Sequence, residues 1–312
     1  MSLEQFKKKR EEWLASLNGG DIHSIWKQQT SLLWDYALFQ TIRAIRKEAL
    51  AHPAAGIGFN EPVLRLFEAG FAVIQATGIR RLAERQWKDR NTGQVKQSKR
   101  IISLRALVDE IQENRELLTR EIYLGLHGLP FDPAPAKQRH FNSIAASGHK
   151  FVFEGWDTKG PKAWAESKRA HERFDKLSEK TAASRSSDDR VSPKWFAKMI
   201  ARIEDCKGVC VVADKFIAHA ADPVNRAGLK NEQTTLTLSQ LAKCHQAMLQ
   251  VAGFIAGPLL QDSMSAGLPV PQFDPLENLD KAWVSTSGLQ KAREHWHRHA
   301  DEIKKWTAAP LL

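Results

Sequence analysis

The sequence predicts a mostly α fold, a helical bundle of about six to eight helices with an irregular Pro/Gly-rich insertion. Three features predict this fold. Hydrophobic residues recur at three- and four-residue steps through most of the 312 residues. No strong two-residue alternation, which would indicate half-buried strands, accompanies them. Proline, glycine and serine gather in a few stretches between the periodic segments, where one helix would end and the next begin.

The first part of the chain is expected to contribute three long helices. Asp21 can cap the free amides of the first, and Pro53 ends it because the residue before a proline avoids the helical region. Pro62 suits the first turn of the second helix. A polar, basic stretch then predicts an exposed loop over 85–100. We therefore expect helices over residues 21–50, 62–86 and 103–126.

Residues 128–160 depart from this pattern. They contain Pro130, Pro133 and Pro135 and the short apolar run "KFVFEGW". This composition predicts an irregular insertion that can hold a short strand pair. Helical periodicity then returns, interrupted by the polar linker "TAASRSSDDRVS". We expect helices over residues 162–180, 193–222, 237–260 and 276–306.

These segments are expected to form one composite domain with three parts. Residues 1–127 would be the N-terminal helical part of the bundle. Residues 128–190 would hold the insertion, a helix and the linker, and residues 191–312 would be the C-terminal helical part that carries His219.

The composition favours an anionic partner. The chain has a formal net charge of +10 and a pI near 9.5, which would concentrate anions around it, nucleic acid first among them. The alternative is an ordinarily basic protein. No apolar run reaches the roughly 18 residues that cross a bilayer, the first residues are charged, and three cysteines make no disulfide framework. These features predict a cytoplasmic protein that has no membrane partner.

Common catalytic motifs are absent. The sequence has no glycine-rich phosphate loop, no Cys-x-x-Cys, no Gly-x-Ser-x-Gly and no His-Glu-x-x-His. Cys206 and Cys210 lie one helical turn apart and could share a metal with Cys244 or His245, although small buried thiols are the commoner outcome. His295 and His299 are a similar pair, and a solvated helix face explains them more simply. We therefore expect neither a metal nor a cofactor.

The predicted loop over 85–100 is a candidate nucleic-acid contact. The loop over 85–100 carries several lysines and arginines around Trp87, a pattern that can bind RNA or DNA and that also occurs in ordinary exposed loops. A further arginine follows the helix predicted over 193–222. The predicted RNA-binding residues are Lys88, Arg90, Lys96, Lys99, Arg100 and Arg226.

The stretch "ADKFIAHAADPVNR", residues 213–226, holds the candidate chemistry. On one continuous helix Lys215, His219 and Asp222 would share a stripe at the edge of the apolar face. The carboxylate could orient the imidazole for acid/base work, and the lysine could hold a phosphate. Equally, His219 could compensate the dipole at the end of the helix and bond to Asp222.

The segment "ADKFIAHAAD" resembles the final-helix signature of the HEPN superfamily. That signature is an arginine, roughly four to six residues and then a histidine, often with Asn, Asp or His directly after the arginine. The order "SLLWDYALFQTIRAI", "ATGIRRLAERQ", "SLRALVDEI" and "DKFIAH" is similar to the abortive-infection AbiU-like branch. The resemblance covers about residues 20–125 and 190–260, and only the last motif is sharp.

The resemblance implies an all-α homodimer that acts as a metal-independent endoribonuclease in phage defence or as a toxin. Its partners would be RNA, either tRNA or mRNA, and an antitoxin or defence partner. His219 would assist attack of a ribose 2′-OH on the adjacent phosphate, with Asp222 orienting it. Asp214 matches the family's polar residue, and Lys215 would contact the phosphate.

This chain departs from the family pattern at one position. Ala213 stands where the motif arginine is expected, and alanine can neither clamp a phosphate nor stabilise transition-state charge. Lysine at 215 is not equivalent to arginine at a bidentate site. Other Arg–His pairs have the permitted spacing and are expected by chance at this composition, namely Arg46 with His52, Arg120 with His127, and Arg293 with His299.

Two rival functions remain open. One is a non-catalytic helical module that binds protein or nucleic acid and has lost the motif arginine. The other is a structural helical protein without a nucleic-acid role, which predicts weak retention on heparin or RNA resin even at low salt.

Overall fold

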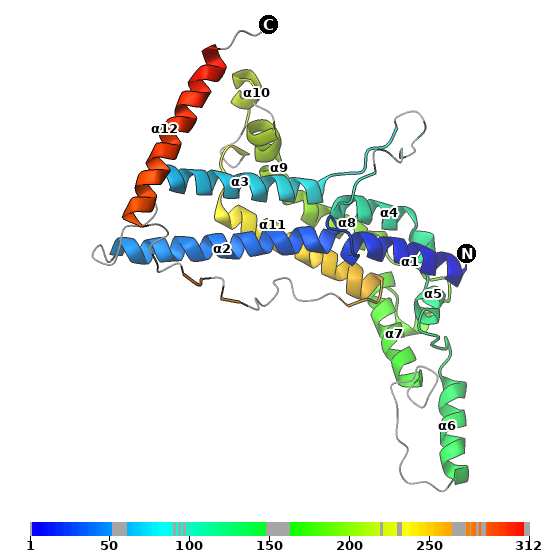
Figure 1. The fold of residues 1–312 in the computed structure, drawn as a ribbon. Coiled ribbons are helices and arrows are strands. Elements are labelled where there is room, and N and C mark those ends of the chain that lie inside the picture. Colours follow the sequence, from blue (N-terminus) through cyan, green and yellow to red (C-terminus); the bar gives the residue numbers. More distant parts are fainter. Residues whose placement is uncertain are drawn as a thin grey trace. The chain divides into compact units, whose positions relative to one another are not determined.

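The structure is a computed structural model, and it describes residues 2–51, 61–89, 92, 95, 98, 100–147, 163–218, 221–229, 233–263, 273–274, 276–278, 281 and 285–308. These residues form twelve α-helices and no β-strand, so the predicted mostly α fold is confirmed (Figure 1). The helices are α1 (Leu3–Asn18), α2 (Ile25–Ala51), α3 (Glu61–Ala83), α4 (Leu104–Glu113), α5 (Arg120–Gly125), α6 (Ala134–Ser147), α7 (Ala163–Ser178), α8 (Pro193–Glu204), α9 (Lys207–Val212), α10 (Pro223–Ala227), α11 (Leu238–Phe254) and α12 (Thr286–Ala308).

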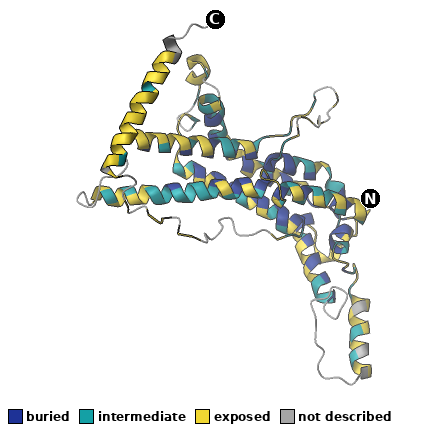
Figure 2. Cartoon of the chain, in the orientation of Figure 1, coloured by how far each residue is buried: buried dark blue, intermediate teal, exposed yellow. Residues whose placement is uncertain are grey.

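The chain divides into two compact units. The first comprises Met1–Pro269 and includes residues from all three expected parts, and the second comprises Val270–Leu312. The described part of the second unit is chiefly α12, whose described side chains are almost all exposed (Figure 2).

The core of the first unit lies between helices that are distant in sequence. The helix α11 packs against α2, α3, α4 and α8, and α3 also packs along the segment from α9 to residue 218. Figure 2 shows buried residues gathering where α1, α4, α8 and α11 meet. Leu107, Ile111, Phe196 and Met248 are among the apolar side chains buried there. This packing stabilises the bundle because it removes one apolar face of each helix from water.

The first helix of the structure was not expected from the sequence. The charged segment at the start of the chain forms α1, which begins with a capping box between Ser2 and Gln5 and buries Phe6, Trp13 and Leu17. The other face of α1 is polar and charged. Because apolar residues are few in this segment, the hydrophobic periodicity of the sequence is weak there. The chain's beginning is therefore part of the core.

Two predicted long helices are interrupted. The one predicted over 103–126 ends at Glu113, and α5 starts seven residues later, at Arg120. Its cap is Thr119, whose side chain accepts from Ile122 N at 3.3 Å. The one predicted over 193–222 is interrupted between α8 and α9, where the ψ angle of Cys206 is −1°. A regular α-helix has a ψ of about −42°. A single apolar stripe can continue across such a break, so periodicity did not reveal it.

Other boundaries also differ from expectation. Asp21 does not cap α2: its Oδ1 accepts from His23 N at 2.6 Å in a turn, and the helix starts at Ile25. Residues 134–147 of the predicted irregular insertion form α6, since prolines lose no hydrogen bond in a first helical turn. The run "KFVFEGW" lies outside the described residues.

A buried histidine joins α11 to α3 and α2. His245 Nε2 donates to Gln75 Oε1 at 2.8 Å, and Gln75 Nε2 donates to Leu32 O at 2.9 Å. The ring of Tyr36 meets the imidazole edge-on, with 5.3 Å between centroids. Because burial disfavours the charged imidazolium, the pKa of His245 falls to about 4.

This lowered pKa predicts a loss of stability in acid. The unfolded state binds the proton near pH 6.5 and the folded state only near pH 4, so the free energy of unfolding falls by about 3 kcal/mol as pH drops through this window. Urea titrations of the wild type and of His245→Gln over that range will test this. The variant should lack this part of the pH dependence; parallel curves would contradict the assignment.

Candidate functional site

The segment that carries the candidate motif does not form one continuous helix. After α9 the chain widens into a π-helix over Ala213–Ala218, and α10 begins at Pro223. A π-helical turn is often found at functional sites. His219 and Ala220 lie outside the described residues. The stripe predicted for Lys215, His219 and Asp222 assumed α-helical spacing throughout, and that premise is wrong.

The position of the family's arginine is buried. Ala213 is 0% exposed, so residue 213 belongs to the core and offers no surface to a phosphate. Arg80 of α3 instead brings a guanidinium to the next residue: its Nε donates to Asp214 Oδ1 at 2.6 Å, and its Nη1 donates to Glu84 Oε2 at 3.2 Å. The hydrogen bond that Arg80 donates to Asp214 raises the pKa of Arg80. Two carboxylates already neutralise this arginine, so it pins the segment to α3.

The other predicted carboxylate also has a structural partner. Asp222 is the cap of α10: its Oδ1 accepts from Asn225 N at 2.9 Å and its Oδ2 from Asn225 Nδ2 at 2.6 Å. The backbone hydrogen bond from Asn225 is the main reason that the pKa of Asp222 is lowered. The carboxylate therefore stays ionised and is oriented by α10.

The cations of the segment are placed differently. Lys215 is partly exposed and Phe216 is 38% exposed, and the guanidinium of Arg226 lies 5.8 Å from the centroid of the Phe216 ring. Among the described residues neither Lys215 nor Arg226 is paired with a carboxylate. The turn into α10 therefore brings the cation of Arg226 back onto the exposed ring of Phe216, which follows Lys215 in the chain.

The described ends of the predicted basic loop contact α4. Lys88 pairs with Glu113, and Arg100 Nη2 lies 3.7 Å from Glu110 Oε2. Arg85 Nε similarly donates to Asp109 at 3.3 Å. The remaining predicted contacts, Arg90, Lys96 and Lys99, lie outside the described residues. An RNA would have to displace these exposed ion pairs, which individually contribute little.

No metal centre is found among the described residues, since no group of three or more His, Cys, Asp and Glu could hold an ion there. Cys206 and Cys244 are buried side by side, and burial, followed by the nearby Cys244 and Asp214, raises the pKa of Cys210 to about 12. The thiol of Cys210 therefore stays protonated at neutral pH. On α12 the rings of His295 and His299 stack with 6.4 Å between centroids.

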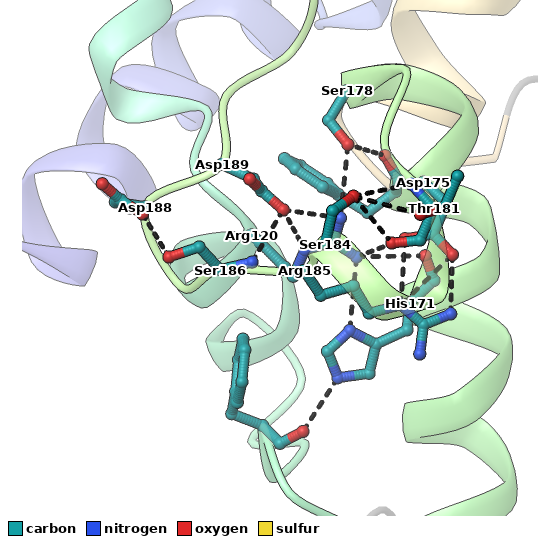
Figure 3. Close-up of polar contacts among 12 residues, drawn as sticks. Arg120, His171, Asp175, Ser178, Thr181, Ser184, Arg185, Ser186, Asp188 and Asp189 are labelled. Carbon is teal, nitrogen blue, oxygen red and sulfur yellow. Dashed lines mark hydrogen bonds and ion pairs between the residues drawn. The ribbon is translucent and has the colours of Figure 1, made fainter.

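One alternative Arg–His pair is separated by the fold. Arg120 is 0% exposed and lies at the centre of the polar cluster in Figure 3. Its Nε donates to Asp189 Oδ2 at 3.0 Å, its Nη1 to Asp175 Oδ1 at 2.8 Å and its Nη2 to Ser178 Oγ at 3.2 Å. No donor remains for a phosphate, so pairing with the exposed His127 would gain nothing.

The same cluster explains a buried histidine. Arg120 Nη1 lies 3.3 Å from His171 Nδ1, and His171 Nε2 lies 2.9 Å from Phe131 O (Figure 3). Because the guanidinium can only donate and the carbonyl can only accept, the neutral ring carries its proton on Nε2. Burial lowers the pKa of His171 and keeps it neutral. The cluster holds α5, α7 and residues 185–190 together. Its polar groups are used in these structural contacts.

Comparison with protein-family models, with curated proteins and with solved structures finds no match. None of the described helices is long and apolar enough to span a membrane.

Proposed function

We propose that this chain is an HEPN-like helical protein that binds RNA through the segment 213–226. The observation that supports this most is the contact of Arg226 with the exposed ring of Phe216, which follows Lys215 in the chain, because cations beside an exposed aromatic ring can hold single-stranded RNA. The phosphates would meet the two cations and a base would stack on the ring. The net charge of +10 favours the encounter.

The proposal includes cleavage and assembly. His219, three residues beyond Phe216, would act as acid and base on the ribose 2′-OH, and Lys215 would hold the phosphate. Two copies would complete one site in a cytoplasmic homodimer, in phage defence or as a toxin held by an antitoxin. Arg80 and Asp222 would hold the segment in shape from either end.

RNA binding should depend on this surface. We expect Phe216→Ala to weaken binding of a single-stranded RNA about tenfold, because it removes the ring on which one base stacks. Combined Lys215→Gln and Arg226→Gln should also flatten the salt dependence by roughly 0.7 in log–log slope for each phosphate that is no longer neutralised. Fluorescence anisotropy of labelled RNA over a salt series measures both.

Two matched controls belong to this experiment. Lys243→Gln removes an exposed cation of α11 outside the segment and should bind as the wild type does. Lys88→Gln should have a smaller effect than the segment variants because Lys88 is already paired. Equal losses of affinity in all variants would mean that binding reflects net charge alone.

Cleavage is tested separately. Incubating the protein with total tRNA and EDTA should yield products that end in a cyclic phosphate, and His219→Ala should slow their appearance by about 100-fold or more. A circular dichroism spectrum unchanged by the substitution would show that the fold is kept. Undiminished cleavage by His219→Ala would remove the assignment.

A non-catalytic binding module is the second candidate. Burial of residue 213 and neutralisation of Arg80 by Asp214 and Glu84 favour it. Ala213, at the position of the motif arginine, carries no charge. The guanidinium of Arg80, which reaches Asp214, is already paired. RNA binding without cyclic-phosphate products would select this function.

A further inference from the structure

A cleft of about 730 Å³ lies in the first unit between α5, α7, α8 and the end of α11. None of its lining residues belongs to the segment 213–226. Its volume falls in the range of cavities that hold small molecules.

One wall of the cleft is aromatic and held in place. Trp195 of α8 and Phe254 of α11 stack with 4.9 Å between ring centroids and 28° between planes. Trp195 Nε1 donates to Lys176 O at 3.1 Å, which fixes the indole against α7. Leu177 and Tyr123 are buried beneath, each 3% exposed. Since Lys198 Nζ also lies over the indole, 4.4 Å from its centroid, a flat apolar ligand would contact the edge of this aromatic pair.

The turn after α11 forms another part of the lining. The end of α11 becomes a π-helix over Ile255–Leu259 that includes Pro258, and Gln261 follows with a φ of 51°, a left-handed conformation that costs energy for a residue other than glycine. Gln261 Nε2 donates to Tyr123 O at 2.8 Å, and Arg10 Nε donates to Leu260 O at 2.6 Å. Strained backbone conformations of this kind are more frequent at binding sites than elsewhere.

The charges of the cleft favour an anion. Arg173 and Lys176 stand on α7, three residues apart and exposed, and neither is paired with a carboxylate among the described residues. The acidic residue of the lining, Asp262, is occupied by Asn18 Nδ2 at 3.0 Å and by Arg10 at 3.9 Å. At the rim, partial loss of water around the ring, followed by the charges of Arg10 and Arg173, lowers the pKa of His127.

A hydroxyl group without a partner completes the site. Tyr123 lines the cleft, and among the described residues its phenol has no hydrogen-bond partner. Burial raises its pKa, so the group remains a donor at neutral pH. Its hydroxyl can therefore donate a hydrogen bond to a ligand in the cleft.

We propose that this cleft binds a small phosphomonoester with an aromatic body. The phosphate would lie between Arg173 and Lys176 and accept a hydrogen bond from Tyr123, and the ring would lie against Trp195 and Phe254. A phosphate monoester suits these groups because it carries about two negative charges and three terminal oxygens, one for each donor. The site is independent of RNA binding by the segment 213–226.

Isothermal titration calorimetry tests the proposal with AMP, 1-naphthyl phosphate, adenosine and inorganic phosphate as probes. AMP and 1-naphthyl phosphate should each bind with a Kd of about 1 mM or tighter, and adenosine and phosphate alone at least about tenfold more weakly. Binding of AMP but not of naphthyl phosphate would restrict the site to nucleotides within the proposed class. Failure of both aromatic phosphates to bind would overturn it.

Three variants locate the binding. Arg173→Gln combined with Lys176→Gln should weaken AMP binding about tenfold or more, and Tyr123→Phe, which keeps the buried ring, about threefold to tenfold. Arg169→Gln removes a cation of the same helix that pairs with Glu166 outside the cleft, and it should bind as the wild type does. Binding unaffected by the double substitution, or weakened equally in Arg169→Gln, would refute the assignment.

Discussion

Replacing Arg120 by alanine is expected to lower the free energy of unfolding by about 3–5 kcal/mol, because it leaves the buried carboxylate of Asp189 and the partly buried one of Asp175 without their common partner. The guanidinium also lies 5.0 Å from the Phe174 ring, so the substitution removes packing as well. The pKa of Asp175 is lowered overall: burial raises it, but the hydrogen bonds from Arg185 and Arg120 lower it by more. The effect of the substitution should be largest above this pKa, where the carboxylate is ionised. Because the folded pKa is the lower one, this contribution to stability disappears as pH falls through it.

Two variants serve as controls for Arg120. Arg120→Lys should recover only part of the stability, since an ammonium cannot reach both carboxylates and Ser178 at once. Arg115→Ala removes a neighbouring arginine whose hydrogen bond to Val191 O is long, at 3.4 Å, and it should cost less than about 1 kcal/mol. Urea denaturation followed by circular dichroism measures all three. An Arg120→Ala protein as stable as Arg115→Ala would show that the cluster does not hold these helices together.

Trp13→Ala is expected to cost about 3–5 kcal/mol, as large-to-small changes of buried aromatic residues do. Trp13 is 1% exposed on α1 and meets Phe6 edge-on, with 6.4 Å between ring centroids. The substitution would open a cavity where α1 meets the bundle. Thermal or urea unfolding measures the effect.

Trp13→Phe tests the reason for that cost. The buried Nε1 of Trp13 has no hydrogen-bond partner among the described residues, so phenylalanine removes an unpaired donor while it keeps most of the volume, and we expect a cost below about 2 kcal/mol. Trp296→Ala, at a tryptophan that is 73% exposed, should change stability by no more than about 0.5 kcal/mol. Similar losses of stability at positions 13 and 296 would contradict the burial of α1 in the core.

Much of the helical content could be predicted from the sequence. The helices around Phe71, Phe174 and Met248 follow from apolar residues at three- and four-residue steps, and the structure has them within a few residues of the expected ends. Breaks were harder to predict. At Cys206 and around Thr119 the helix is interrupted without a proline or glycine at the break, and the apolar pattern continues across it.

The candidate site was predictable only in part. Lys215 and Arg226 were identified by charge, whereas the contact of Arg226 with Phe216 depends on the turn into α10. Arg80 was not identified, because it lies 134 residues from Asp214 and no local pattern joins them. The catalytic role of His219 remains a prediction.

The sequence by itself determined the mostly α class, the positions of most helices and the surplus of positive charge, because each depends on residue type and on spacing within a few turns of chain. Only the tertiary structure decided which cations among the described residues remain unpaired. Lys88 and Arg120 bind carboxylates supplied by distant segments, while Lys215 and Arg173 do not. Whether a charge is neutralised depends on its neighbours in space, and the packing of helices far apart in the sequence sets those neighbours.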